Sequence, residues 1–363
     1  MRPIRDVFTE QCTKAGKHEY KESLLQIPED TFGIEGEITD ITLYPGKALG
    51  GLSVPEARIT RYGLETLEGL RDRAFMLGKI QPTHQTAMFT RFSQREEPQL
   101  SQVKPDFDGK ILRYDALPNL KITLPEMEPR QGQVVTVEVV PGTVVRAVRE
   151  SGPINAAIRI YLKKFRDDAD QIEVLLPAAD FDRPVEVRHS RNQNAQTRFS
   201  DGGQILLASE PSLKWIQKHI NKAHGTAEKL YEDARQILMT VIRPNITVEG
   251  WPEHLEDLLT DAVIEGMLPV IIAGTVEEMR EHLLMLFGDL SVRCSVTQVD
   301  PATGMRADDN EPIATFSKKR PLRADGSSNK ATFAVNTVFP RQMWGGTFKK
   351  GDKIVSGKEK QVA

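Results

Sequence analysis

Hydrophobic and polar residues alternate along several short stretches of this chain, with the period of two that is typical of strands with one buried face. The alternation is clear at residues 134–140 and 290–297, and short β-like runs at residues 38–44, 73–77, 111–112 and 237–242 add further expected strands. Gly and Pro residues separate them, as is usual where short strands are joined by turns. We therefore predict a protein built mainly from short strands.

Apolar residues at helical spacing interrupt this pattern in three places and predict helices. The first helix covers 154–165, and the second follows Ser209 and ends at Gly225. The third region, 251–288, has helical periodicity and a capping-box motif in its middle. We predict that it is a helical insertion packed on the outside of the molecule.

The composition narrows the class of protein. With 363 residues, 39% of them hydrophobic, the chain can bury the cores of two ordinary domains. The net charge of −3 provides no general attraction for nucleic acid, so we expect no nucleic-acid partner. The N-terminal region is polar, and no apolar run approaches the ~18 residues of a membrane span. We expect a cytoplasmic protein without a membrane anchor, with a mitochondrial location as the alternative.

The chain contains two cysteines, Cys12 and Cys294, which are too few for a disulfide framework or a four-thiolate cluster. Cys294 lies in the alternating stretch 290–297, where its position predicts a side chain that points into the core. Arg293 is then expected on the opposite face of the same strand. A buried cysteine is often a small hydrophobic residue without chemistry, and the strand pattern alone leaves that interpretation open.

The residues around Cys294 favour a chemical role. The run Arg293-Cys294, followed by Thr297 and by the sequence VDPATG at 299–304, resembles the signature of the MOSC family, named for the C-terminal domain of molybdenum cofactor sulfurases. Residues 243–246, with the sequence RPNI, resemble a second motif of that family. In this motif Pro244 should keep Arg243 extended, so that Arg243 and Asn245 face one ligand.

The region from residue 41 to residue 100 resembles the β-barrel domain that precedes many MOSC domains, through a YPxK motif ending at Lys47 and an LRDR motif ending at Arg73. This resemblance implies an α+β fold with a β-barrel-rich, two-domain architecture, peripheral helices and the insertion at 251–288. The predicted divisions are a polar tail (1–35), the N-terminal β-barrel-like domain (36–178), the MOSC domain (179–357) and a short tail (358–363).

The resemblance also implies a site for the molybdenum cofactor, a pterin with a phosphate and a metal. Cys294 would supply a thiolate to molybdenum. The predicted cofactor-binding residues are Lys47, Arg73, Asp201, Arg243, Asn245 and Arg293. Guanidinium and ammonium groups suit a dianionic phosphate because they form charge-assisted hydrogen bonds with it. Asp201 precedes two glycines, so it is equally well explained as a turn residue, and both interpretations stay open.

The first functional hypothesis is a molybdenum-cofactor-dependent oxidoreductase that reduces small N-hydroxylated compounds. Its electrons would come from a separate cytochrome b5-like or ferredoxin-like protein. One alternative is sulfur transfer through a persulfide on Cys294, and another is a cofactor carrier without turnover. The family has a weak general association with pyridoxal phosphate as well.

Overall fold

The computed structural model describes residues 33–81, 88–127, 132–190, 195–224, 239–259, 261–272, 275–320 and 330–357. Three predictions concern parts of the chain outside these residues. They are the polar tail before residue 33, the helix end at Gly225 and the short tail at 358–363.

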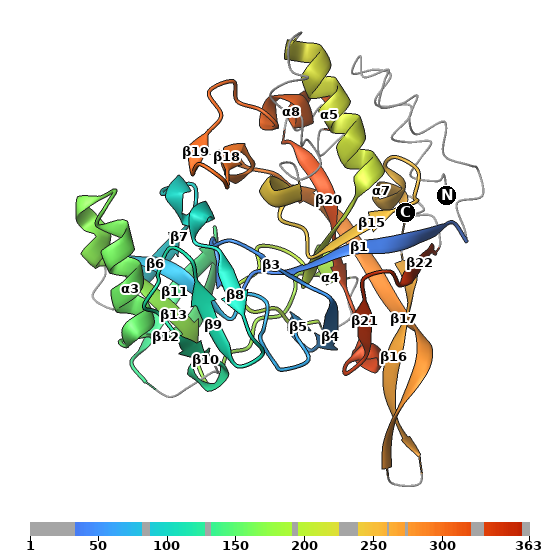
Figure 1. The fold of residues 1–363 in the computed structure, drawn as a ribbon, viewed down its shortest axis with the longest axis horizontal. Helices are drawn as coiled ribbons and strands as arrows, with labels where there is room; N and C mark the ends of the chain where they lie inside the picture. The colour runs from blue at the N-terminus through green and yellow to red at the C-terminus, as the bar shows by residue number, and fades with distance from the viewer. Residues whose placement is uncertain are drawn as a thin grey trace.

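The smaller of two barrels lies on the left in Figure 1 and is a closed ring of five strands. Around the ring the strands pair in the order β13, β12, β11, β7 and β6. Strand β6 then pairs with β13 and closes the ring. The strands are β6 (Phe75–Gln81), β7 (Met88–Phe92), β11 (Val134–Val140), β12 (Thr143–Arg149) and β13 (Ile172–Pro177). The short strand β2 (Gly46–Lys47) joins β6 in parallel.

Strand β13 of this barrel is buried on both faces, whereas β11 alternates buried with more exposed residues. All six residues of β13 are buried. Its Val174 packs in the cluster on the outer face, together with α3, whereas its Leu175 packs in a second cluster with β11 and β12. The outer face is covered by α3 (Pro153–Leu162) and a small sheet of β8 (Pro105–Phe107), β9 (Ile111–Tyr114) and β10 (Ile122–Thr123). The predicted helix at 154–165 is thus confirmed.

The larger barrel, on the right in Figure 1, is also closed, because β17 and β16 pair and complete a ring. The ring order is β17, β20, β14, β15, β1, β22 and β16. Its strands are β1 (Glu35–Leu43), β14 (Ile205–Ser209), β15 (Ile246–Glu249), β16 (Asp261–Ile272), β17 (Thr275–Val292), β20 (Thr332–Val338) and β22 (Lys353–Ser356). Strands β3 (Leu52–Val54), β4 (Glu56–Thr60), β5 (Gly63–Glu65) and β21 (Thr347–Lys349) extend this sheet.

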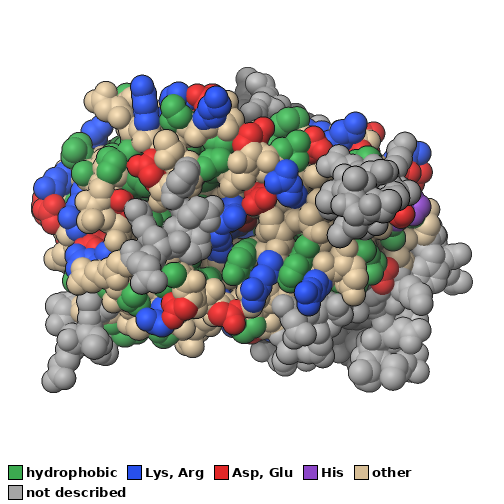
Figure 2. Space-filling model, turned by 90° about the horizontal axis from the view of Figure 1, so that it is seen from below, with side chains coloured by type: hydrophobic (Ala, Val, Ile, Leu, Met, Phe, Trp, Pro, Cys, Tyr) green, Lys and Arg blue, Asp and Glu red, His purple; other side chains and the backbone are tan. Residues whose placement is uncertain are grey.

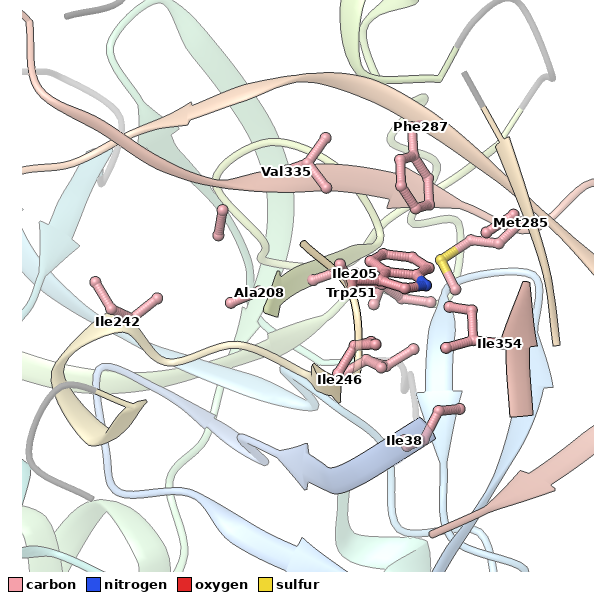
Figure 3. Close-up of a cluster of buried hydrophobic side chains, with 14 of the residues drawn as sticks. Ile38, Ile205, Ala208, Ile242, Ile246, Trp251, Met285, Phe287, Val335 and Ile354 are labelled. Atoms are coloured by element: carbon pink, nitrogen blue, oxygen red, sulfur yellow. The ribbon is translucent and has the colours of Figure 1, made fainter. Parts of the chain in front are cut away.

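The core of the larger barrel is centred on Trp251, which is 1% exposed and packs among side chains from several strands (Figure 3). Its indole Nε1 donates a hydrogen bond to the carbonyl of Ile34 at 3.2 Å. Outside the barrel lie α4 (Val187–Ser190), α5 (Glu210–His224), α7 (Leu255–Leu258) and α8 (Ile313–Lys319). Short 3-10 helices cover Pro98–Gln102 (η1), Leu124–Met127 (η2), Asp167–Gln171 (η3), Ser295–Gln298 (η4) and Arg341–Met343 (η5). A two-stranded hairpin consists of β18 (Val299–Asp300) and β19 (Met305–Arg306).

The predicted helical insertion at 251–288 is wrong. Apart from the short helix α7, this region forms the long hairpin of β16 and β17, which projects from the barrel in Figure 1. Leu283, Met285 and Phe287 are fully buried, whereas the residues between them are partly exposed. The run LLMLF fits helical spacing and period-two spacing equally well. Pairing of β17 with β20 decides for the strand, which is a tertiary contact that periodicity does not reveal.

The predicted strand at 237–242 is wrong as well for its described part, because residues 239–242 are helical. The overall fold class is confirmed: the protein is α+β, rich in β-barrels and has peripheral helices. The division into domains at 36–178 and 179–357 stays a prediction. The strand pairing adds that β1, early in the chain, pairs with β15 and β22 of the larger barrel.

Candidate functional site

One cavity of about 160 Å³ brings together residues from distant parts of the sequence. The predicted site residues Lys47, Arg73, Asp201, Arg243, Asn245, Arg293 and Cys294 all line it. Lys47 in β2 and Arg73, just before β6, line the cavity from the side of the smaller barrel. Asp201, before β14, and Cys294, after β17, line it from the side of the larger barrel. The structure therefore gathers every predicted residue at one place, while the role of each in binding stays a prediction.

The lining of this cavity is strongly cationic. Its Lys and Arg residues are Lys47, Arg73, Arg91, Arg95, Arg243 and Arg293, against Asp201 as the carboxylate among the lining residues. The chain as a whole has a formal charge of −3, and the face shown in Figure 2 mixes Lys and Arg with Asp and Glu. The positive charge is thus a property of the cavity, which suits it to an anionic ligand.

Cys294 follows directly on the end of a strand. Strand β17 ends at Val292, and Cys294 occupies the N-cap position of η4, where its carbonyl accepts a hydrogen bond from the Thr297 amide at 3.0 Å. The expectation of a strand through residue 297, with Cys294 buried in the core, is therefore wrong. Its side chain is half-buried and lies in the wall of the cavity. A cysteine in this position is accessible to a ligand.

Arg95 lines the same cavity, although it was not among the predicted site residues. Its guanidinium Nη2 donates a hydrogen bond to Cys294 Sγ at 3.0 Å. Arg306, from β19, donates to the carbonyls of Gln94 and Arg95, so the Arg95 backbone is anchored to the hairpin that follows the cysteine. Burial disfavours the charge of Arg95, but negative charge on Cys294 and Asp201 outweighs it and raises the pKa of Arg95. Arg95 lies in the sequence QREEP at residues 94–98, within the region that resembles the N-terminal β-barrel domain, and this position was the available signal.

Lys47 and Asp201 form an ion pair across the cavity, with 2.6 Å between Nζ and Oδ1. Burial lowers the pKa of Lys47 to about 8. Desolvation inside the cavity opposes the charge of Asp201, but Lys47 and nearby arginines hold the pKa of Asp201 well below its usual value. The glycines after Asp201 let its loop lie against Asn336, whose Oδ1 accepts the Gly203 amide hydrogen bond at 3.1 Å. Asp201 therefore lies in a bend and lines the cavity, while its contact with a cofactor stays a prediction.

Arg73 is held in place by two side chains. Its Nη1 donates to Asp72 and, at 3.2 Å, to the Asn245 side-chain oxygen. Burial raises the pKa of Asp72. Asn245 is 2% exposed, and its side chain also donates to the Thr42 carbonyl and accepts from the Leu206 amide. Asn245 thus joins β1, β14 and Arg73, so the geometry gives it a structural contribution besides its place in the cavity wall.

Arg243 differs from the expectation that its backbone is extended. Its amide donates to the Met239 carbonyl at 2.9 Å at the end of the helical turn, and its φ is +61°. The described part of the chain places no carboxylate within ion-pair distance of its guanidinium, which instead lies 4.2 Å from the centre of the Tyr44 ring. Burial, together with the charges of Arg73 and Arg293, lowers the pKa of Arg243 to about 10.

Arg293 lies on the same cavity wall as Cys294, although the strand pattern predicted opposite faces. The prediction fails because the strand ends before both residues. The Arg293 Nη2 atom donates to the Ile242 carbonyl at 2.6 Å, while its buried Nε has no hydrogen-bond partner in the described structure. Burial lowers the pKa of Arg293. Its guanidinium keeps hydrogen-bonding capacity for a ligand.

Three residues of the cavity region have left-handed backbone conformations that are uncommon outside glycine. They are Ala48 (φ +78°), Arg73 (φ +48°) and Arg243 (φ +61°). Such backbone strain is often concentrated at binding sites, where the surrounding structure enforces it.

A second cavity, of about 580 Å³, adjoins the first through Arg243 and Gln94. In the described residues, no His, Cys, Asp and Glu side chains group as a metal site, and none of the helices could span a bilayer.

The fold and the site thus define a two-barrel protein with a cysteine in the wall of a cationic cavity. Residues 35–151 match the family described as the MOSC N-terminal beta barrel domain. The chain is 25% identical to mouse mitochondrial amidoxime-reducing component 1 over 333 residues, which is 88% of this chain and 82% of the mouse protein. It is 25% identical to bovine mitochondrial amidoxime reducing component 2 over 304 residues, covering 84% and 77% of the two chains. The resemblance to the MOSC family is thus confirmed.

Proposed function

We propose that this protein is a molybdenum-cofactor-dependent oxidoreductase of the MOSC type that reduces N-hydroxylated compounds. The observation that carries the proposal is the position of Cys294 in the wall of a cavity lined by six Lys and Arg side chains. The substrate class comes from the names of the relatives, which are amidoxime reducing components. The cavity supplies the independent chemical argument, because it combines a soft ligand with a site for phosphate.

The residues present fit the cofactor. Cys294 offers a half-buried sulfur, and thiolates are ligands for soft metal centres. The guanidinium of Arg243 has no carboxylate partner in the described chain, and the Arg293 Nε is buried without a hydrogen bond. Leaving a buried donor unsatisfied is costly, so these two arginines favour a bound anion with several acceptor oxygens.

Each residue then has a defined part. Lys47, Arg73 and Arg243 would bind the phosphate, Arg293 and Asp201 would contact the pterin, and Asn245 would hold Arg73 in place. Cys294 would ligate molybdenum through Sγ, and Arg95 would fix the orientation of that sulfur. When bound, the cofactor supplies two-electron oxygen-atom chemistry. Reduction of an N-hydroxyl group consumes two electrons and two protons and releases water, so a separate electron-donor protein is required.

The donor and the compartment belong to the same proposal. We propose a cytochrome b5-like or ferredoxin-like donor as the source of the two electrons that the reduction consumes. The relatives are named as mitochondrial, which supports a mitochondrial location beside the cytoplasmic one expected from composition. No observation in the cavity favours sulfur transfer or a carrier function over reduction.

The test of the cofactor is metal and pterin analysis of protein purified from a host that makes the molybdenum cofactor. We expect about one molybdenum and one pterin per chain at full loading, because the cavity offers one thiolate and one cationic cradle. Protein that contains zinc or no metal, and that releases no fluorescent pterin on oxidation, would refute the proposal. A persulfide on Cys294 without molybdenum would favour sulfur transfer instead.

The Cys294→Ser variant tests the ligand. Serine is nearly isosteric and can still accept the hydrogen bond from Arg95, so we expect only a modest loss of stability. Because an alkoxide is a harder ligand than a thiolate, turnover of an amidoxime and the molybdenum spectrum should both change strongly, while much of the pterin stays bound. A variant with wild-type turnover and an unchanged spectrum would show that Cys294 is not a ligand.

A further inference from the structure

Tyr44 lies between the two arginines that carry most of the proposed phosphate site. It follows β1, and its side chain is 4% exposed. The centre of its ring is 4.9 Å from Arg73 Cζ and 4.2 Å from Arg243 Cζ. Both distances are within the range of cation–π contacts. One aromatic ring therefore contacts two guanidinium groups that come from different motifs of the chain.

Tyr44 is also bonded to both backbone segments that carry these arginines. Its amide donates to Asp72 Oδ1 at 2.7 Å, and its carbonyl accepts from the Arg73 amide at 2.8 Å. Its hydroxyl donates to the carbonyl of Pro244, the residue after Arg243, at 3.2 Å. Tyr44 thus connects the LRDR segment of the smaller barrel with the RPNI segment of the larger barrel.

Two like charges in a buried place need a compensating group. Asp72 partners Arg73, but the described chain gives Arg243 no carboxylate partner. The negative face of an aromatic ring attracts a guanidinium and, unlike a carboxylate, does not compete for the hydrogen-bond donors that a phosphate needs. The left-handed backbones of both arginines show that the surrounding structure constrains their positions.

We propose that Tyr44 is a positioning residue that holds the Arg73 and Arg243 guanidiniums together as a clamp for a phosphate group. The ring balances the two positive charges, and the hydroxyl fixes the ring to the Pro244 carbonyl. This inference rests on the proposed function, because it assigns the clamp to the phosphate of the cofactor. Tyr44 would act through the two arginines and not through direct contact with the ligand.

The experiment measures binding of inorganic pyrophosphate to the cofactor-free protein by calorimetry, for the wild type and for variants at position 44. Tyr44→Phe keeps the ring, so its affinity should stay within about twofold of the wild type. Tyr44→Leu removes the ring and should weaken binding about tenfold. Tyr161→Leu is the matched control, because Tyr161 is also buried and donates to a backbone carbonyl, but the cation over its ring is Lys164 and not Arg73 or Arg243. The control should bind like the wild type.

A second series keeps the test valid if Tyr44→Leu fails to fold. The series starts from the Tyr44→Phe variant. Its phenylalanine is replaced by phenylalanines with increasing numbers of ring fluorines, which preserve the shape of the ring but weaken its negative face. Affinity for pyrophosphate should fall stepwise along the series. An unchanged affinity across the series, or wild-type protein that does not bind pyrophosphate, would overturn the inference. Because no cofactor is present, a failure of the molybdenum proposal would leave this result standing, and the two failures are distinguishable.

Discussion

Arg95 and Cys294 are 199 positions apart, yet their side chains meet at 3.0 Å. The motif resemblance predicted seven residues that line one cavity, because residues of a shared motif serve a shared site. It did not predict the Arg95 contact, since this contact depends on how the turn after β7 lies against the segment after β17. A charged side chain has no periodicity, and its partner is set by tertiary structure alone.

This contact makes a prediction about thiol reactivity. In a Cys12→Ser background, Cys294 is the one remaining cysteine, and its alkylation by iodoacetamide can be followed at neutral pH in cofactor-free protein. Arg95→Gln removes a positive charge beside the sulfur and should slow alkylation by roughly threefold to tenfold. Arg95→Lys should slow it less. Arg91→Gln is the control from the same cavity and should react at the wild-type rate; equal slowing in both Gln variants would contradict a specific contact.

The lowered pKa of Lys47 predicts how the free energy of unfolding depends on pH. Its pKa is about 8 in the folded protein and 10.5 as the ordinary value, so between these values the unfolded chain binds more protons than the folded one. Stability therefore rises with pH across this window. From pH 8 to pH 10, the free energy of unfolding of cofactor-free protein should rise by about 2 kcal/mol more for the wild type than for Lys47→Met. Urea unfolding at both pH values measures this, and equal changes in both proteins would refute it.

At the scale of elements, the sequence predicted β11, the start of β6, most of β1 and the helices α3 and α5, but it gave no strand for β7, β12 or β13. It failed for β16 and β17. An apolar run of adjacent residues fits both the helical period of 3.6 and the strand period of two. Pairing of β16 with β22 and of β17 with β20 decides for the strand. It also failed at residues 239–242, where a short helical turn delivers Arg243 in a left-handed conformation.

This turn predicts a difference between two substitutions that remove the same guanidinium. Glycine adopts a φ of +61° without strain, whereas alanine does not. Cofactor-free Arg243→Gly should therefore be more stable than Arg243→Ala by about 1 kcal/mol, measured by urea unfolding. Both variants should retain less pterin than the wild type. Equal stability of the two would show that the backbone relaxes at this position, and full pterin retention would exclude Arg243 from the phosphate site.

At the scale of the whole molecule, the larger barrel is assembled from both ends of the chain. Strand β1 lies between β15 and β22, so the ring is open without it. The predicted boundary near residue 178 follows the motifs, but the strand pairing crosses it. Sequence motifs mark where chemistry lies, whereas the closing of a ring depends on pairing between distant strands.

A fragment of residues 179–357 should consequently fail to fold cooperatively, because it leaves the edges of β15 and β22 unpaired. Residues 33–357 are the control and should show a single cooperative transition in urea, followed by circular dichroism. Addition of a peptide covering residues 33–66, which restores β1, β3, β4 and β5, should increase the ordered signal of the short fragment. Cooperative unfolding of the fragment alone would contradict this prediction.

The place of β1 also determines the order of events on the ribosome. Its residues are made first, but its partners in β15 and β22 follow only at residues 246–249 and 353–356. At roughly 10 residues per second, the nascent strand waits on the order of half a minute with its apolar face uncovered. During that time the barrel cannot cover this face. The larger barrel closes only after β22 has been made, and the ring that supports the cavity with Cys294 is complete only then.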